Sequence, residues 1–256
     1  MSDRLLKVVV SHLEADAVDE HLAYLATLCP GPILLCHGGT PERFAAVRWP
    51  RKRFLAHPGL RSPAATFQTY DEALEAAHEV LEADRRIDAI VVLEYDQVPL
   101  APGLDEAVLA LLEQTGAGLV GKTAVDRTAT NWWHRVRYRD DPALLEHLRR
   151  VSVREDPTRI YGCLGTGFAM TREALAAYVA VEHPDGIYNE LYVPTLVHHL
   201  GFRVEDVDAH GDLYAHVRFE PSYTPAEARA LRDAGVLVVH PYKEPLAQLG
   251  DPAAAG

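Results

Sequence analysis

The stretch Ala89-Ile90-Val91-Val92-Leu93-Glu94-Tyr95-Asp96 (89–96) decides the fold, because a pair of acids directly follows an apolar run. The run is short and rich in β-branched residues, which predicts a strand buried on both faces. Such strands occur in sheets that helices cover on both sides. In open sheets of this kind, ligands bind just beyond the carboxyl ends of the strands.

Similar apolar runs alternate with helical patterns along the rest of the chain. Further strands are expected at 7–11, 33–36, 53–56, 118–121, 160–170, 203–207 and 236–239. Helices are expected at 16–28, 70–84, 104–114, 142–150, 171–179, 190–200 and 224–234. This alternation predicts an α/β chain of Rossmann type, with a mixed, mostly parallel sheet flanked by helices.

The composition is that of a globular protein with one large α/β domain. The chain has 256 residues, of which 48% are hydrophobic and 24% charged, and it has neither an internal repeat nor an evident linker. Its formal net charge of −12 disfavours a nucleic-acid partner, because the overall field repels phosphate backbones. An anionic small-molecule ligand would therefore need a local cation.

The cysteine content and the N-terminal sequence predict a reducing, cytoplasmic environment. The chain has an odd number of cysteines (Cys29, Cys36 and Cys163), and their spacing matches no zinc motif. We therefore expect free thiols packed as small hydrophobes. The N-terminal sequence is not a signal peptide, and no apolar stretch approaches the ~20 residues that span a bilayer. Any contact with a membrane is therefore expected to be peripheral.

Glu94 and Asp96 are the first candidate ligands for a cation. Side chains two residues apart point to the same side of an extended backbone, so both carboxylates are expected to face one divalent ion. Mg²⁺ and Mn²⁺ bind carboxylates together with substrate phosphates. Such an ion would supply the positive charge that this acidic chain lacks.

Glu94-Tyr95-Asp96 resembles the D-x-D-type motif of GT-A glycosyltransferases, in its E-x-D variant. The resemblance implies a single GT-A-like domain over 1–256, with a nucleotide-binding half (1–97) and an acceptor-binding half (98–250) that carries a polar insertion (122–159). It also implies that Asp96 binds the metal and that the metal binds the donor diphosphate. Glu94 matches the first, more variable acid, and its extra methylene allows contact with ribose or water instead.

Two later segments resemble the same family. The segment 161–168 (YGCLGTGF) is similar to the glycine-bearing strand beside the acceptor and the donor sugar. Its glycines allow either close approach to a ligand or a tight strand crossing. The segment 188–195 (YNELYVPT) is similar to the region where inverting members carry a catalytic acid. Glu190 is the candidate general base and Asp185 its competitor, although an acid at a helix start also complements the helix dipole.

The chain end and the first strand complete the expected site. In this family a C-terminal histidine often completes the metal shell, which implies a ligand role for His240 with His216 as its rival. Lys243 is then a candidate phosphate contact. Ser11 and His12, at the end of the first predicted strand, are candidates for contact with the base and ribose.

Trp132 and Trp133 lie in the polar insertion 122–159. Sugars stack their C–H faces on aromatic rings, so the pair is a candidate acceptor platform. The alternative is that the two rings anchor the insertion to the core.

Together these features predict a metal-dependent glycosyltransferase of the Leloir type. With Mn²⁺ or Mg²⁺ it would transfer a sugar from a nucleotide-sugar donor to a carbohydrate or another hydroxyl-bearing acceptor. One alternative is a sugar-phosphate nucleotidyltransferase, but such enzymes usually carry a glycine-rich loop with a basic residue where this chain has 11–14 (SHLE). A non-catalytic nucleotide- or carbohydrate-binding module is another. The chain lacks both the G-x-G-x-x-G and the P-loop patterns.

Overall fold

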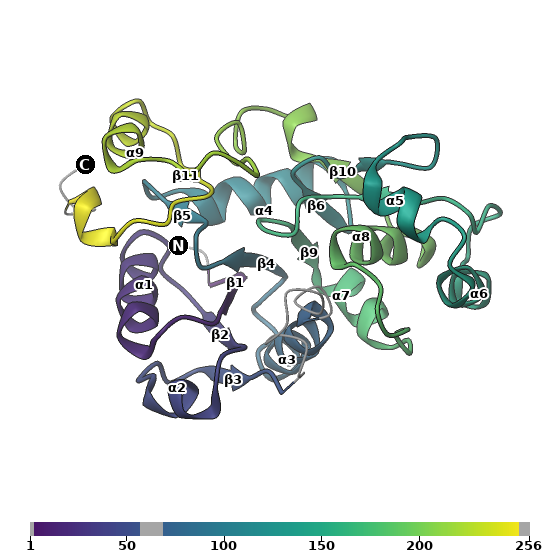
Figure 1. Cartoon of the computed structure of the whole chain (residues 1–256), viewed down its shortest axis with the longest axis horizontal. Coiled ribbons are helices and arrows are strands. Elements are labelled where there is room, and N and C mark those ends of the chain that lie inside the picture. Colours follow the sequence, from purple (N-terminus) through teal and green to yellow (C-terminus); the bar gives the residue numbers. More distant parts are fainter. Residues whose placement is uncertain (1–2, 57–68, 251–256) are drawn as a thin grey trace.

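A mixed sheet of seven strands forms the centre of the computed structural model, which describes residues 3–56 and 69–250 (Figure 1). The strand order is β10-β6-β9-β4-β1-β2-β3, and β9 runs antiparallel to its neighbours β4 and β6 while the other strand pairs are parallel. The strands are β1 (Leu5–Ser11), β2 (Ile33–His37), β3 (Lys52–Phe54), β4 (Ala89–Glu94), β6 (Leu119–Gly121), β9 (Ala169–Thr171) and β10 (Val204–Asp206). The predicted mixed, mostly parallel α/β fold is confirmed.

Helices flank this sheet on both faces, and two short strand pairs lie beside it. The helices are α1 (Ala15–Leu28), α2 (Pro41–Ala46), α3 (Thr69–Ala83), α4 (Leu104–Thr115), α5 (Trp133–Tyr138), α6 (Pro142–Val151), α7 (Arg172–Val179), α8 (Asn189–His199) and α9 (Pro225–Asp233), with 3₁₀ turns η3 (Val207–Ala209) and η4 (Leu246–Leu249). The short pairs join β5 (Val98–Pro99) to β11 (Val238–Val239) and β7 (Val125–Asp126) to β8 (Tyr161–Gly162). No helix in the described parts of the chain is long and apolar enough to cross a membrane.

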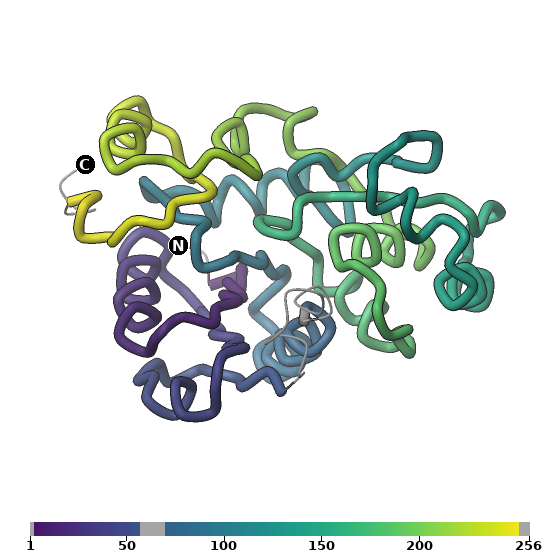
Figure 2. Tube along the Cα trace, in the orientation of Figure 1, coloured from purple at the N-terminus to yellow at the C-terminus, as the bar shows by residue number. Residues whose placement is uncertain are grey.

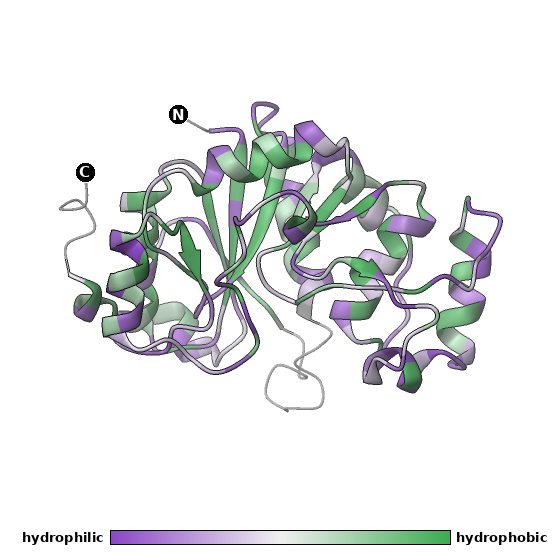
Figure 3. Ribbon diagram, turned by 90° about the horizontal axis from the view of Figure 1, so that it is seen from above, coloured by the Kyte–Doolittle hydropathy of each residue, from purple (hydrophilic) through white to green (hydrophobic). Residues whose placement is uncertain are grey.

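The alternation of side chains in β1 explains the layers. Leu6 and Val8 pack on the face covered by α3, α7 and α8, whereas Leu5 and Val9 pack on the face covered by α1 and α4. Figure 3 shows the central strands as apolar elements between helices that carry polar residues. All three cysteines are buried free thiols, as the sequence predicts.

One buried ion pair interrupts this apolar core. Lys7, in the middle of β1, is 0% exposed, and its Nζ lies 2.6 Å from Asp105 Oδ2 of α4. Nζ also donates to the carbonyl of Pro30 at 3.2 Å. Burial raises the pKa of Asp105, whereas Lys7 lowers it. Each charge therefore depends on its partner to remain in the core.

Lys7→Ala is expected to lower the free energy of unfolding by about 3–5 kcal/mol, because it leaves Asp105 charged and unpaired in the core. The double variant Lys7→Met/Asp105→Leu should recover most of this loss, since it replaces both charges with apolar groups of similar size. Urea unfolding monitored by circular dichroism measures both effects. A double variant as unstable as Lys7→Ala would show that the pair is not the cause.

The prediction of one strand over 160–170 is wrong. Only β8 and β9 are extended there, and the segment between them is irregular. Gly167 has φ +75°, which ends the extended conformation, and a Cβ at this position would lie 2.6 Å from Gln97 Nε2. The glycines therefore accommodate side chains of the protein itself.

Candidate functional site

A tight turn after β4 presents the acids of the 94–96 motif. The N–H of Gln97 donates to the carbonyl of Glu94 at 3.0 Å, and Thr166 Oγ1 accepts from the N–H of Glu94 at 2.9 Å while donating to the Gln97 side chain. The expectation that both acids lie on extended backbone is therefore wrong, because Tyr95 and Asp96 belong to the turn. The turn nevertheless brings both carboxylates to one place.

His240 reaches this turn through the short sheet of β5 and β11. β5 follows the turn directly and pairs with β11, and the N–H of Tyr242 donates to the carbonyl of Asp96 at 2.8 Å. One ligand atom from each of Glu94, Asp96 and His240 lies within 4.8 Å of the others. The side chains of Asp96 and His240 are both nearly buried, with 7% exposed.

The hydrogen bonds of this triad leave two of its possible ligand atoms facing each other. His240 Nδ1 donates to the carbonyl of Arg218 at 2.6 Å, so Nε2 directs its lone pair outward. Nε2 lies 3.3 Å from Asp96 Oδ1, a buried oxygen without a hydrogen-bond partner in the described structure. Two acceptors that face each other need a second ring proton or a bound cation between them. The two carboxylates of this donor set are ligands that Mn²⁺ and Mg²⁺ prefer, whereas the imidazole is a ligand that also suits Zn²⁺ and Fe²⁺.

Glu94 is held from the side opposite Asp96. Its Oε1 accepts a hydrogen bond from Tyr70 of α3 at 2.9 Å. Burial raises the pKa of Glu94 and the neighbouring charge of Asp96 raises it further, whereas the Tyr70 hydrogen bond lowers it. A cation beside these carboxylates would relieve both unfavourable effects.

The other residues predicted for donor binding differ in their placement. Lys243 is 56% exposed, with Nζ 3.8 Å from Asp96 Oδ2 at the rim of the triad. His12 is exposed and lies edge-on to Tyr95, with ring centroids 5.1 Å apart. Ser11 is buried and accepts the N–H of Leu13 at 3.3 Å, so its hydroxyl is engaged in the local turn.

His216, the rival metal ligand, points elsewhere. Its carbonyl accepts the N–H of His240 at 3.2 Å, but its side chain lines a separate cavity of about 520 Å³ next to Asp212 and Leu237. The structure thus brings His240 rather than His216 to the two acids.

Glu190 lies in the first turn of α8, near the triad. Its Oε1 accepts the N–H of Gly165 at 2.9 Å, and only 18% of the side chain is exposed. Burial raises the pKa of Glu190 to about 7, and the charge of Glu94 contributes to the rise. Asp185 is exposed in the turn before α8, and within residues 3–56 and 69–250 no described contact links it to the triad.

An aromatic stack lies on the outer side of Glu190. His134 Nε2 is 3.7 Å from Glu190 Oε2, and its ring centroid is 3.6 Å from both Trp133 and Tyr188. Burial lowers the pKa of His134 to about 4, so the ring is neutral at neutral pH. Trp133 is 57% exposed, which leaves ring surface open to solvent beside Glu190.

Trp132, unlike Trp133, packs against the rest of the protein. A Cβ at Gly162 would lie 2.5 Å from its ring, and the guanidinium of Arg127 lies 5.3 Å from the ring centroid. Trp132 therefore anchors the insertion, while Trp133 is the ring available to a ligand.

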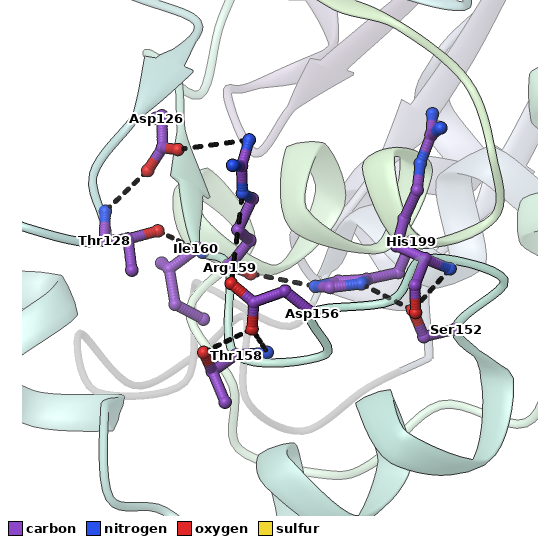
Figure 4. Close-up of polar contacts among 9 residues, drawn as sticks. Asp126, Thr128, Ser152, Asp156, Thr158, Arg159, Ile160 and His199 are labelled. Atoms are coloured by element: carbon purple, nitrogen blue, oxygen red, sulfur yellow. Dashed lines mark hydrogen bonds and ion pairs between the residues drawn. The ribbon is translucent and has the colours of Figure 1, made fainter.

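Further contacts fasten the end of the insertion to α8 and β7 (Figure 4). His199 Nδ1 lies 2.9 Å from Ser152 Oγ, and its Nε2 donates to the carbonyl of Arg159 at 2.8 Å. The Arg159 side chain lies 3.8 Å from Asp126 and 4.0 Å from Asp156. These contacts, together with the packing of Trp132 against Gly162, fasten the insertion that carries His134.

Three neighbours of the site were missed by the sequence analysis. Tyr70 donates to Glu94, His134 lies beside Glu190, and His21 lies close enough to Asp96 for the Asp96 charge to act on its pKa. Only His134 carried a local signal, since it directly follows the tryptophan pair. The other two sit on helices α3 and α1, and only the packing of these helices on the sheet brings them to the motif.

Comparison with known proteins adds little to this picture. No family model matches the chain, and no curated protein matches it. Among solved structures, the A197 protein from STIV matches with a TM-score of 0.38 and 12% sequence identity, over 80% of this chain and 81% of that chain. At this TM-score the match carries no information about the family or function of this chain.

Proposed function

We propose that this chain is a metal-dependent glycosyltransferase that moves a sugar from a nucleotide-diphosphate sugar to an acceptor hydroxyl. The observation that carries the proposal is the buried Oδ1 of Asp96, which has no hydrogen-bond partner among the described residues and faces His240 Nε2 at 3.3 Å with Glu94 alongside. A divalent cation satisfies all three groups and supplies the charge on which an anionic donor can dock.

Each residue of the triad has a defined part in this proposal. Asp96, Glu94 and His240 would hold Mn²⁺ or Mg²⁺, and the bound ion supplies Lewis-acid stabilisation of negative charge on the leaving diphosphate. Lys243, at the exposed rim, adds a mobile cation for a phosphate oxygen. Tyr70 keeps the Glu94 carboxylate oriented through its hydrogen bond.

Glu190 is the proposed general base. A pKa of about 7 is close to the working pH, where a carboxylate both accepts a proton effectively and is substantially ionised. The Gly165 N–H fixes Oε1, which leaves Oε2 on the side of His134. The exposed ring of Trp133 offers a stacking surface for a sugar acceptor beside this carboxylate.

A thermal-shift screen of nucleotides and sugar nucleotides, with and without Mn²⁺, tests the proposal. A nucleoside diphosphate should raise the melting temperature when Mn²⁺ is present and have little effect with EDTA, because ligand bound only to the folded state stabilises it. At about 100 times Kd, binding contributes roughly 2.7 kcal/mol.

Other outcomes point to other functions. A nucleoside triphosphate giving the largest shift would favour the nucleotidyltransferase alternative. A manganese-dependent shift with neither transfer nor donor hydrolysis would favour a binding module. No shift from any nucleotide with Mn²⁺ would overturn the proposal.

A further inference from the structure

A cavity of about 310 Å³ lies between α1 and the segment that follows β11. Figures 1 and 2 show this C-terminal segment running beside α1. Leu13, Ala17 and Leu246 contribute apolar wall, and the partly buried Tyr95 adds an aromatic residue; Tyr242 also lines the cavity, although only 2% of it is exposed. This lining suits a flat, partly apolar ring better than a hexose, which carries hydroxyl groups on every edge.

The cavity also contains a buried polar group without a partner. His21 of α1 is 6% exposed, and in the described structure its Nε2 has no hydrogen-bond partner. Burial lowers the pKa of His21 to about 4, so the ring is neutral and offers one donor and one acceptor nitrogen. A buried polar atom without a partner is costly, and because Nε2 is closed off from solvent in this structure, a ligand with polar ring atoms would satisfy it only after a small shift of the cavity wall.

The cavity adjoins one end of the metal triad. Tyr95 lies between the two acids of the motif, and the cavity residue Lys243 is 3.8 Å from Asp96 Oδ2. Asp96 also acts on His21, where its charge partly opposes the fall in pKa. The neighbourhood of Asp96 therefore includes the cavity.

Glu94, the other acid of the motif, lies near Tyr70 and Glu190 instead. Glu94 accepts a hydrogen bond from Tyr70, and its charge contributes to the raised pKa of Glu190. The triad thus lies between the cavity and Glu190. A donor whose diphosphate is held at the triad would place its sugar near Glu190 and its nucleoside on the opposite side.

We infer that this cavity receives the nucleobase of the donor, between Tyr95, Tyr242 and His21. The inference rests on the proposed function, since it supposes that the diphosphate binds at the triad. It differs from the expectation drawn from Ser11 and His12. The base would pack against α1 and the C-terminal segment, and His12 would only support Tyr95 from its edge. The carboxylates of Glu20 and Glu244 also line the cavity and can accept N–H groups of a base.

Ala17→Phe tests the inference, because Ala17 is an exposed helix residue whose enlargement fills the cavity without touching the triad. Ala23→Phe is the matched control, an exposed alanine of the same helix outside the cavity lining. Isothermal titration calorimetry with Mn²⁺ would compare nucleoside diphosphates of four bases with inorganic pyrophosphate, which has no base.

For the wild type, we expect at least one nucleoside diphosphate to bind roughly tenfold to a hundredfold more tightly than pyrophosphate, as stacking of a base on aromatic rings allows. Ala17→Phe should remove this advantage and leave pyrophosphate affinity unchanged, whereas Ala23→Phe should behave as the wild type. His21→Phe keeps a ring of similar shape and should weaken only the nucleoside diphosphate.

Two results would overturn the inference while the proposed function stands. One is a nucleoside diphosphate that binds Ala17→Phe as tightly as wild type, and the other is a set of nucleoside diphosphates that bind no more tightly than pyrophosphate. If neither pyrophosphate nor any nucleoside diphosphate binds with Mn²⁺, the proposed function itself fails, and the inference fails with it.

Discussion

Asp96→Asn is expected to abolish the manganese-dependent stabilisation by a nucleoside diphosphate and to lower sugar transfer by about a thousandfold or more. The substitution keeps the shape of the side chain but removes the charge that the cation needs. The variant should nevertheless fold. An asparagine Nδ2 can donate to the lone pair of His240 Nε2, so two opposed acceptors at 3.3 Å become a hydrogen-bonded pair.

The metal-free Asp96→Asn protein should be at least as stable as the metal-free wild type, by up to about 1 kcal/mol. The reason is that Asp96 raises the pKa of the buried Glu94 by charge repulsion, and the amide does not. Melting temperatures with EDTA and with Mn²⁺ plus nucleoside diphosphate measure both effects. Asp140→Asn makes the same chemical change at an exposed site and should alter neither. An Asp96→Asn variant that keeps the full metal-dependent shift would refute the metal assignment.

Glu190→Gln is expected to lower the rate of sugar transfer by about 10²–10⁴-fold, the usual contribution of a general base. Affinity for Mn²⁺ and a nucleoside diphosphate should change little, because Glu190 belongs to the acceptor side of the site. The Gly165 N–H can still donate to the glutamine carbonyl, so the loop should keep its position. Release of nucleoside diphosphate from the donor found in the thermal-shift screen measures the rate.

The pH profile gives a second readout of the same residue. A base must be ionised, and burial holds the pKa of Glu190 near 7, so the wild-type rate should rise as pH increases through this region. A bound cation favours the carboxylate, which would move the inflection below 7. In Glu190→Gln the inflection should disappear.

Two control variants separate Glu190 from its alternatives. Glu173→Gln changes an exposed acid in the first turn of α7 and should leave the rate unchanged. Asp185→Asn tests the rival base. If Asp185→Asn loses sugar transfer while Glu190→Gln retains it, Asp185 is the general base and Glu190 is not.

Much of the fold could be predicted from the sequence because long elements carry their own periodic signal. The expected helices at 16–28 and 70–84 correspond to α1 and α3 within a residue at each end. The helices expected at 171–179 and 224–234 also form, and each begins at a threonine cap whose side chain accepts from a backbone N–H: Thr171 from Ala174 and Thr224 from Glu227. The spacing of apolar residues and the capping of helix ends are local properties, so both can be recognised in one segment of sequence without knowing what it packs against.

Elements that depend on a partner were not predictable in this way. β5 and β7 were not expected at all, and they are extended only because β11 and β8 pair with them. The motif at 94–96 shows the same limit, because both acids were expected on extended backbone, whereas only Glu94 ends the strand and Asp96 lies in a turn that Thr166 stabilises from a distant segment.

The sequence singled out the three residues that the fold brings together, but not their surroundings. Glu94, Asp96 and His240 carry chemistry that can be recognised by residue type and order. The partners that tune them, such as Tyr70 and His134, are ordinary residues whose relevance comes from helix packing and from the stack on Tyr188. Such contacts join residues that are far apart in the sequence, so no motif or regular spacing predicts them.

The origin of the three cation ligands has a consequence for biosynthesis. Two come from the middle of the chain, and the third arrives only with the short pairing of β11 on β5, long after every strand of the central sheet has been made. A ribosome-bound or prematurely terminated product that stops before His240 would contain the complete sheet and still lack the imidazole that closes the triad. Under the proposed function, retention on a manganese column is therefore expected to separate finished polypeptides from shortened ones.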